Sequence, residues 1–341
     1  MSAQGGRVRR RRAARCSLAS AFVSLAVVVH GCCSHGSVTL LVPTPSRPPL
    51  AAQYSEIATA LQAYFDGLHS CDVARFQEAW HPEGRLYGKA PDGTLIDRDA
   101  GEFCAGIAAR DKSEHLSEHD RINTIDVLSD SCAYAKVQIA MTPSPVSSAF
   151  FSGDVLYTDF LVLHKLNCRW QIISKVFSAA PLGQASYREK LEERMGPIAG
   201  PLGESVREYF RGGHLSSPEV VAKSFHPNAR LCFADASGNL TALSREAFFQ
   251  RLTARPATPE DASQRFDKIV SVDKAGPDVA IVKLQIGYPP WVSRDPGFVS
   301  RPQGVLYTDV LSMMRLGPVG EGHWWIVAKS SESVPFPSGP S

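Results

Sequence analysis

The chain has 341 residues, of which 44% are hydrophobic and 21% are charged, a composition typical of a globular protein with room for two domains. Its formal net charge of +2 depends on seven arginines in the first fifty residues, because the remainder carries 29 basic and 34 acidic residues, a net charge of −5. A body of that sign offers no basic surface to a phosphate backbone, so we expect no nucleic-acid partner.

The first fifty residues have the layout of a targeting segment. An arginine cluster at 7–15 precedes an uncharged apolar run at 16–29, and small residues follow at 31–34. The run is shorter than the roughly twenty residues that a membrane span needs. We therefore expect a signal or transit peptide with a Pro-rich spacer over residues 1–50, directing the chain to the secretory pathway or an organelle. An uncleaved membrane anchor and a disordered cytosolic tail are the alternatives.

The body of the chain contains an internal repeat. Residues 61–110 match residues 206–255 without a gap at an offset of 145, and the sequence Leu-Tyr-Thr-Asp at 156–159 recurs at 306–309. Gaps fall only between predicted elements, as expected of loops. The domain organisation that follows is a first copy at 51–180, a linker at 181–203, a second copy at 204–334 and a disordered tail at 335–341.

Three helices are predicted at the beginning of each copy. In the first copy they cover 57–68, 73–80 and 99–110, with a short strand at 85–87 and a turn at 91–93. Apolar residues at helical spacing define the first helix, and Pro82 stops the second. The Pro-Asp-Gly sequence at 91–93 is a turn signal, and Asp99 is a good N-cap for the third helix.

The rest of each copy predicts strands. In the first copy, residues 122–128, 133–141, 155–165 and 170–177 alternate apolar with polar residues and are rich in Val, Ile and aromatics. Helices followed by an antiparallel meander predict an α+β fold.

Four segments of the first copy resemble the putative lumazine-binding branch of the nuclear transport factor 2-like superfamily, which includes SnoaL-like proteins. They read Tyr-Phe-Asp-Gly-Leu at 64–68, Trp-His-Pro at 80–82, Tyr-Thr-Asp-Phe-Leu at 157–161 and Arg-Trp-Gln-Ile-Ile-Ser-Lys-Val-Phe at 169–177, and the second copy keeps a thinner version. The resemblance implies two tandem cone-shaped domains, each with N-terminal helices packed in a curved, mainly antiparallel sheet around a conical pocket. It implies no single activity, because the superfamily hosts isomerases, dehydratases, cyclases and non-catalytic binders.

The resemblance also implies roles for particular residues. In ketosteroid isomerase-like members, a first-helix tyrosine and a late-strand carboxylic acid donate hydrogen bonds to a substrate oxygen, and a second carboxylate removes a proton. In the first copy the tyrosine falls on Tyr64 and the acid on Asp159, whereas the position of the base falls at about Gly88. The catalytic base is therefore missing. The corresponding residues of the second copy are Tyr209, Asp309 and Phe233.

Alternation along the late strand offers two interpretations of this acid. Tyr157, Asp159 and Leu161 fall on one face of the strand, and Tyr307 and Asp309 repeat the pattern. An acid flanked by an aromatic and an apolar residue favours the lining of a pocket. Alternatively the acid is structural, and accepts bonds from a nearby hydroxyl or backbone donor that fix the sheet against the first helix, because a buried carboxyl must be paired.

Further candidate ligand-binding residues lie at the end of the second predicted helix of each copy. His81 and His226 each precede a proline there, where an imidazole can close unpaired helix carbonyls, so turn architecture and an acid–base or ligand role are both open. Trp80, beside His81, joins the candidate lining. Five cysteines in the body show no C-x-x-C spacing; we expect them to be buried free thiols, and we expect neither a metal site nor a cofactor.

Our leading hypothesis is a small-molecule-binding protein, non-catalytic or weakly catalytic, with a conical apolar pocket in one or both copies for a small hydrophobic or aromatic ligand. The competing hypothesis is an isomerase, dehydratase or cyclase acting on a small carbonyl compound, with His81 or an unrecognised residue as base. A third is a scaffold with pockets filled by side chains. In each case we expect the two copies to pair through their sheets as an internal pseudo-dimer.

Overall fold

The computed structural model describes residues 49–143, 153–182, 200–235, 238–254, 265–288, 303–318 and 322–335, with the side chains at 114 and 115 excepted. The described residues all belong to one compact unit, residues 48–341. Most of the predicted targeting segment, of the linker and of the tail lies outside the described residues. Within the described ranges, no helix is both long enough and apolar enough to cross a membrane.

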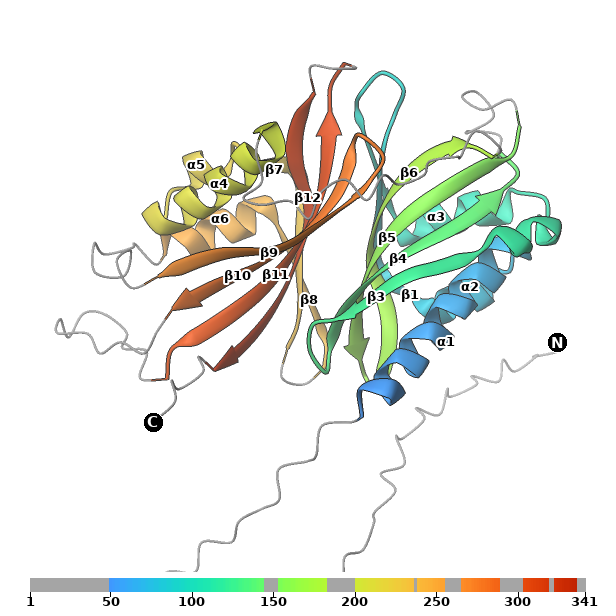
Figure 1. Cartoon of the computed structure of the whole chain (residues 1–341), viewed down its shortest axis with the longest axis horizontal. Coiled ribbons are helices and arrows are strands. Elements are labelled where there is room, and N and C mark those ends of the chain that lie inside the picture. The colour runs from blue at the N-terminus through green and yellow to red at the C-terminus, as the bar shows by residue number, and fades with distance from the viewer. Residues whose placement is uncertain are drawn as a thin grey trace, which may run out of the picture. The chain divides into compact units, whose positions relative to one another are not determined.

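The helices of the first copy lie on one face of its sheet (Figure 1). They are α1 (Leu50–His69), α2 (Val73–Ala79), α3 (Ala100–Ala108) and the 3-10 helix η1 (Glu114–His119). The Asp72 carboxylate caps α2 by accepting from the backbone N–H of Arg75. Asp99 and Glu102 form a reciprocal capping box at the beginning of α3, which confirms the predicted cap.

Six strands form the first sheet, in the order β2-β1-β6-β5-β4-β3. They are β1 (Trp80–Lys89), β2 (Leu95–Asp99), β3 (Arg121–Val127), β4 (Cys132–Met141), β5 (Val155–Leu166) and β6 (Arg169–Pro181). Every pairing is antiparallel except that of β1 with β6, which is parallel. The predicted α+β fold with a mainly antiparallel sheet is therefore confirmed.

The sequence missed one hairpin of this sheet. β1 extends well beyond the predicted 85–87, and β2 pairs with it antiparallel on the other side of the predicted turn. Gly93 supplies the positive φ of that turn, at +86°. The carboxylate of Asp92 accepts from the backbone N–H of Thr94 at 2.9 Å. β2 has only five residues, Leu-Ile-Asp-Arg-Asp, in which two adjacent apolar residues precede three charged ones, so it shows no period-two apolar pattern.

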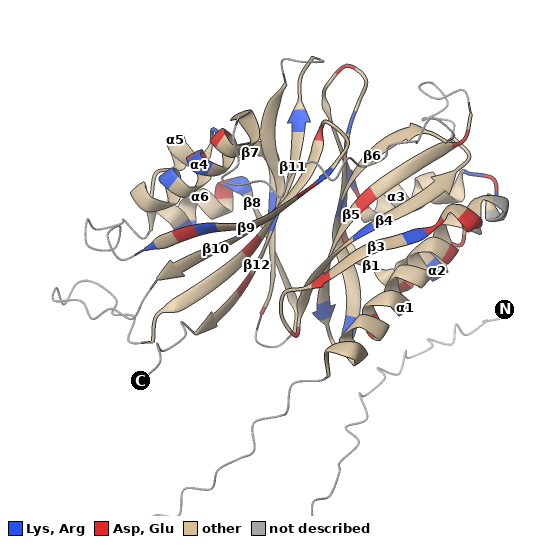
Figure 2. Ribbon diagram, in the orientation of Figure 1, with Lys and Arg blue, Asp and Glu red and all other residues tan. Residues whose placement is uncertain are grey.

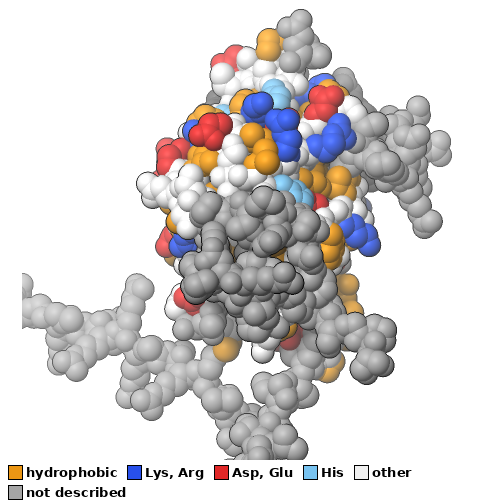
Figure 3. Space-filling view, turned by 90° about the vertical axis from the view of Figure 1, so that its left-hand side faces the viewer, with side chains coloured by type: hydrophobic (Ala, Val, Ile, Leu, Met, Phe, Trp, Pro, Cys, Tyr) orange, Lys and Arg blue, Asp and Glu red, His pale blue; other side chains and the backbone are white. Residues whose placement is uncertain are grey.

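The second copy repeats this arrangement. Its helices are α4 (Gly200–Leu215), α5 (Pro218–Val221) and α6 (Arg245–Thr253), and its strands are β7 (Phe225–Ala234), β8 (Leu240–Ser244), β9 (Phe266–Ala275), β10 (Val279–Tyr288), β11 (Val305–Leu316) and β12 (His323–Pro335). The strand order β8-β7-β12-β11-β10-β9 is that of the first sheet with each strand replaced by its counterpart. The face in Figure 3 carries charged side chains of both signs among hydrophobic ones. The prediction of two tandem copies is confirmed.

The two faces of β5 have different environments, as the alternation predicted. Tyr157 and Leu161 face the helices of their own copy, in a cluster with α1, α2 and α3. Phe160 and Val162 point the other way, into a second cluster that contains Val310 and other residues of the second sheet. The helix-facing side is therefore the interior of one copy, and the opposite side is shared between the sheets.

Reciprocal ion pairs accompany the contact between the sheets. Lys136 Nζ lies 3.0 Å from Asp273 Oδ1, and Lys283 Nζ lies 2.9 Å from Asp126 Oδ2. Lys283 is the repeat counterpart of Lys136, and Asp273 is that of Asp126, both at an offset of 147. Each copy therefore contributes the same lysine and the same aspartate to the contact. In Figure 2 the ribbon of β9 carries both acidic and basic positions. The two ion pairs are thus equivalent by the repeat.

A buried polar cluster also lies between the sheets. His164 Nε2 shares a hydrogen bond with Ser330 Oγ and approaches Cys132 Sγ to 3.7 Å. Burial, with a smaller contribution from His81, lowers the pKa of His164 to about 4. Burial raises the pKa of the Cys132 thiol to about 12. Both groups are therefore uncharged at neutral pH. Cys104 and Cys232 are buried free thiols like Cys132, whereas Cys168 is exposed and Cys71 only partly buried, contrary to prediction.

Candidate functional site

Three buried polar side chains meet in the interior of the first copy, and we call them the first centre: Tyr64 from α1, Asp159 from β5 and Lys175 from β6. The Tyr64 hydroxyl donates to Asp159 Oδ2 at 2.7 Å, and Lys175 Nζ donates to the same oxygen at 2.8 Å. Lys175 also donates to the Tyr64 hydroxyl at 2.8 Å. In the strand register Lys175 lies opposite Leu161, two residues from Asp159, so Lys175 and Asp159 are diagonal neighbours on one face.

Burial fixes how the protons are arranged in the first centre. Burial and then the Asp159 carboxylate raise the pKa of Tyr64 well above its usual value, so the phenol keeps its proton. Burial lowers the pKa of Lys175, and the Asp159 carboxylate opposes that effect. The single hydroxyl proton of Tyr64 is directed at Asp159, and its oxygen accepts from Lys175. Tyr64 and Asp159 therefore form a donor–acceptor pair rather than two donors that face a substrate oxygen.

Aromatic rings surround the Lys175 ammonium. Its Nζ lies 5.2 Å from the ring centroid of Phe177, 5.5 Å from Tyr64, 5.6 Å from Phe103 and 5.8 Å from Tyr157. Tyr157 and Phe177 meet edge to face at 5.7 Å, and both remain partly accessible to solvent. This accessible aromatic pair lies on the same face of the sheet as Asp159.

Two polar groups beside the first centre are buried without a hydrogen-bond partner among the described residues. One is Asp159 Oδ1, on a residue with 0% of its surface exposed. The other is the pair Nε and Nη2 of Arg110, which follows α3. The remaining Arg110 nitrogen, Nη1, contacts only the Met141 sulfur, at 3.2 Å. Burial lowers the pKa of Arg110, whose charge in turn acts on the pKa values of Tyr64 and Lys175.

The corresponding second centre consists of Tyr209, Asp309 and Lys329. Tyr209 donates to Asp309 Oδ2 at 2.7 Å, and Lys329 Nζ lies 3.0 Å from that oxygen. Here the other carboxylate oxygen is paired as well, because Ser331 Oγ donates to Asp309 Oδ1 at 2.7 Å. Burial and then Asp309 raise the pKa of Tyr209. Asp309 thus has both oxygens satisfied within its own copy, whereas Asp159 has one.

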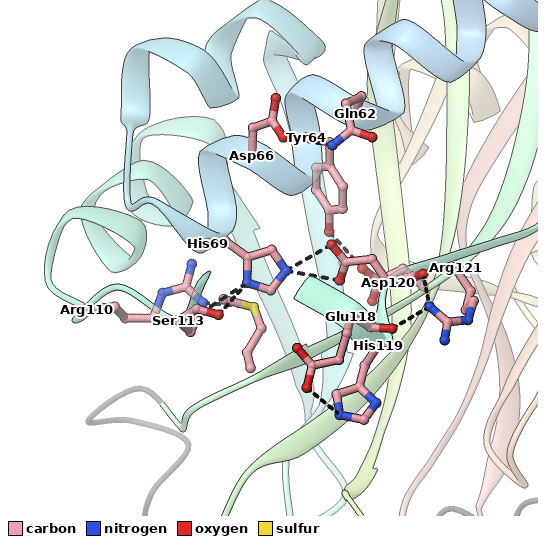
Figure 4. A network of polar contacts seen from close by, with 12 residues as sticks. Gln62, Tyr64, Asp66, His69, Arg110, Ser113, Glu118, His119, Asp120 and Arg121 are labelled. Atoms are coloured by element: carbon pink, nitrogen blue, oxygen red, sulfur yellow. Dashed lines mark hydrogen bonds and ion pairs between the residues drawn. The ribbon is translucent and has the colours of Figure 1, made fainter. Parts of the chain in front are cut away.

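A hydrogen-bonded histidine–aspartate pair holds the C-terminal end of the helix that carries Tyr64 (Figure 4). His69, at the end of α1, places Nε2 3.0 Å from both Asp120 carboxylate oxygens, just before β3. Its Nδ1 lies 3.0 Å from the backbone oxygen of Ser113. Both ring nitrogens are therefore occupied by protein groups. The pair connects the end of α1 to η1 and β3, and so fixes the helix against the sheet.

The second copy repeats this pair, which our sequence reasoning missed. His214 Nε2 lies 2.6 Å from Asp267 Oδ2, whose other oxygen accepts from Arg265 Nε at 2.9 Å. A signal was available, because His69 and His214 are separated by the repeat offset of 145. Lys175 and Lys329 were visible in the same way as repeated residues. Arg110 was also part of the matched segment, although its counterpart Arg255 lies outside the described residues.

Of the remaining predicted site residues, Trp80, His81 and His226 do not join the two centres. Trp80 is buried against Phe76 and Phe103 as part of the core. His81 belongs to β1, and its Nδ1 accepts from the backbone N–H of Glu83 at 3.1 Å. His226 does the same with Asn228 at 3.2 Å. Each imidazole therefore accepts a hydrogen bond from the strand backbone N–H two residues later in the chain. The prediction had been a hydrogen bond to helix carbonyls. Tyr307 remains beside Asp309 on the helix-facing side of β11 and packs against Tyr288.

The position where the resemblance implied a base is filled by an aromatic ring. A Cβ at Gly88 would lie 2.5 Å from the Phe177 ring, so any larger residue would displace that ring from Lys175. No group of three or more His, Cys, Asp or Glu side chains in the described part of the chain is arranged to hold a metal ion. The chemistry present around Asp159 is thus an ion pair, an accessible aromatic pair and two unpaired polar groups.

Comparisons with known proteins agree with the fold. A family model described as "Putative lumazine-binding" matches residues 52–178 and 201–296, one segment in each copy. A curated relative, "Aldolase FrzH" from Cladobotryum sp., is 26% identical over 136 residues, which make up 38% of this chain and 94% of that protein.

Solved structures with a similar fold each cover about one copy. An NTF2-like protein of unknown function from Shewanella baltica OS155 is 21% identical, with 39% of this chain and 98% of that chain covered and a TM-score of 0.33. A ketosteroid isomerase-like protein from Erwinia carotovora atroseptica SCRI1043 is 16% identical, with 37% and 96% covered and a TM-score of 0.28.

Proposed function

This chain belongs to the putative lumazine-binding family, and from that premise we propose that its first copy is a small-molecule-binding domain whose ligand contacts Asp159 Oδ1. The observation that carries the proposal is the buried carboxylate oxygen without a partner, next to the accessible rings of Tyr157 and Phe177. An unpaired buried acceptor costs about 1–3 kcal/mol of stability, and a ligand donor would remove that cost. The rings supply the apolar surface that favours a small hydrophobic or aromatic ligand.

The hydrogen bonding in the first centre supports a binder over an isomerase. In the isomerase arrangement, the tyrosine and the acid both donate to a substrate oxygen. Here the Tyr64 hydroxyl donates its hydrogen bond to Asp159, and Asp159 is in contact with the Lys175 ammonium. Gly88 offers no base at the position where the resemblance would place one. The centre is therefore suited to accept a hydrogen bond from a ligand.

A screen by thermal shift, followed by titration on matched variants, tests this function. Ligand that binds only the folded state raises the melting temperature. Tyr64→Phe and Asp159→Asn should then weaken binding per folded molecule, because each change nearly conserves volume and alters hydrogen bonding. The control variants are Tyr209→Phe and Asp309→Asn in the second centre, which should leave the affinity unchanged. A large loss of stability with unchanged affinity per folded molecule would assign Tyr64 and Asp159 to the fold alone.

Catalysis on a small carbonyl compound is the second candidate, and Lys175 is the observation that favours it. Burial lowers the pKa of this amine, which brings it closer to the range in which a lysine can act as a base. Its neighbour Tyr64 keeps a proton that could be passed on. The similarity to a protein named as an aldolase is in keeping with carbonyl chemistry. Turnover of a carbonyl compound that is lost in Lys175→Met but retained in Lys329→Met would support this role.

A further inference from the structure

The unpaired edge of Arg110 is the geometric feature that defines a ligand group. Nε and Nη2 lie on the same side of a guanidinium, and their two N–H bonds run parallel. That edge binds a carboxylate through two parallel hydrogen bonds. Both nitrogens of Arg110 are buried and have no hydrogen-bond partner in the described part of the chain. Nη1 is turned to the Met141 sulfur, a weak acceptor.

The second copy shows what a protein partner does for such an arginine. Arg265 is almost fully buried, and its Nε donates to Asp267 Oδ1 at 2.9 Å. Arg110 has no such carboxylate among the residues that the structure describes, and burial lowers its pKa. A buried cation is stable only when it is paired. The pairing group that Arg110 requires is therefore not supplied by the described residues of the first copy.

The charges around the first centre limit the net charge of the ligand group that can pair with Arg110. Arg110 and Lys175 are cations, and Asp159 is the carboxylate in contact with Lys175. The remaining nearby carboxylate, Asp120, is paired with His69. Among Arg110, Lys175 and Asp159 the cations exceed the anion by one charge, so one negative charge from a ligand balances these three groups, whereas a phosphate dianion would exceed that balance in a low-dielectric interior. A monoanionic carboxylate is the group that matches.

We infer that the ligand of the first copy is a small aromatic carboxylic acid that also carries a hydrogen-bond donor, an inference that rests on the proposed binding function. Arg110 binds the carboxylate through its Nε and Nη2 edge, and Asp159 Oδ1 accepts from the donor group, a hydroxyl or an amine. The ring lies against Tyr157 and Phe177. This assignment makes Arg110 the anchor for the anion and Asp159 the residue that selects for the donor.

Matched probes test the assignment by calorimetric titration of the full chain. The probes are 4-hydroxybenzoate, 4-hydroxyphenylacetate and 3-(4-hydroxyphenyl)propionate, which grade the distance between carboxylate and hydroxyl, and the primary amide of each. We expect at least one acid to bind about tenfold or more tightly than its amide, because a charge-assisted bidentate pair is lost in the amide. The same acid without its hydroxyl should bind more weakly.

Arg110→Gln should remove this preference, so that acid and amide bind with affinities within about twofold of each other. Arg110→Lys, which keeps the charge but not the two-donor edge, should lose most of it. Arg98→Gln removes the same charge from the neighbouring strand β2 and should leave binding unchanged. Removal of a buried, unpaired cation should not lower the melting temperature, so both Arg110 variants are expected to fold.

The outcomes distinguish a failure of this inference from a failure of the proposed ligand-binding function. Amides that bind the wild type as tightly as the acids, or an acid preference that persists in Arg110→Gln, would overturn the inference while leaving a binding function in place. Failure of every acid and every amide to bind, with no other compound of the screen stabilising the chain, would overturn both.

Discussion

Phe177 occupies in the first copy the position that Ser331 occupies in the second. In the strand registers, Asp159 lies opposite Phe177 and Asp309 lies opposite Ser331. The serine donates to Asp309 Oδ1, and the phenylalanine has no donor to offer Asp159. One substitution between the copies thus accounts for the unpaired oxygen. The same substitution adds an aromatic ring beside Lys175.

Removal of the serine should therefore destabilise the second copy. Ser331→Ala leaves Asp309 Oδ1 buried without its donor, and we expect the free energy of unfolding to fall by about 1–3 kcal/mol. Ser333→Ala, two residues on and exposed, is the matched control and should change it little. Urea unfolding followed by circular dichroism measures both. Equal effects of the two substitutions would show that the Ser331 bond contributes nothing.

His164 makes the stability of the chain depend on pH. Its pKa is about 4 in the folded state and 6.5 in the unfolded state, so the unfolded chain binds the proton first as the pH falls. The stability contributed by the neutral imidazole is present above pH 6.5 and is lost between pH 6.5 and about 4, amounting to about 3 kcal/mol. His164→Asn should reduce this loss, and His119→Asn, outside the interface, should not. Urea unfolding at pH 7.5 and at pH 5 compares the variants, and an unaltered slope in His164→Asn would be contrary evidence.

We propose that the two copies remain paired in solution as an internal pseudo-dimer. The reciprocal pairs of Lys136 with Asp273 and of Lys283 with Asp126 support this, as does the apolar cluster that the sheets share. Small-angle scattering from the purified chain should then fit one compact body. A profile of two bodies on a flexible tether would contradict the proposal.

The targeting role of residues 1–50 also stays a proposal, carried by the arginine cluster and the apolar run that follows it. N-terminal sequencing of the protein from its native host should find a mature chain that begins near residue 50. Intact Met1 on a cytosolic protein would exclude both cleavage and targeting.

The fold could be predicted from the sequence because the signals were local and appeared twice. The Asp99 cap, the turn at 91–93 and the alternation around Asp159 each depend on neighbouring residues. The repeat then confirmed the element order independently. β2 was missed because its five residues have no apolar alternation, and only its pairing with β1 identifies it as a strand.

The site was only partly accessible to the same reasoning. Tyr64 and Asp159 were expected to lie together, and they are hydrogen-bonded across 95 positions of sequence. Lys175 was visible as a repeated residue, but its role depends on a diagonal placement set by the strand register. The sequence could not predict that Arg110 Nε and Nη2 have no hydrogen-bond partner among the described residues. That depends on how the interior packs and not on any sequence pattern. His81 and His226 were misplaced because each lies in a strand that begins earlier than predicted.

The stoichiometry of ligand binding tests the central claim most directly. Calorimetric titration with the tightest-binding compound of the screen should give one site per chain, because, of the two described aspartates at the centres, Asp159 has a buried oxygen without a partner and Asp309 does not. Asp159→Asn should weaken binding at that site in the folded protein, and Asp309→Asn should leave the affinity unchanged. Two sites per chain, or a single site lost in Asp309→Asn and kept in Asp159→Asn, would contradict the claim that the first centre binds the ligand.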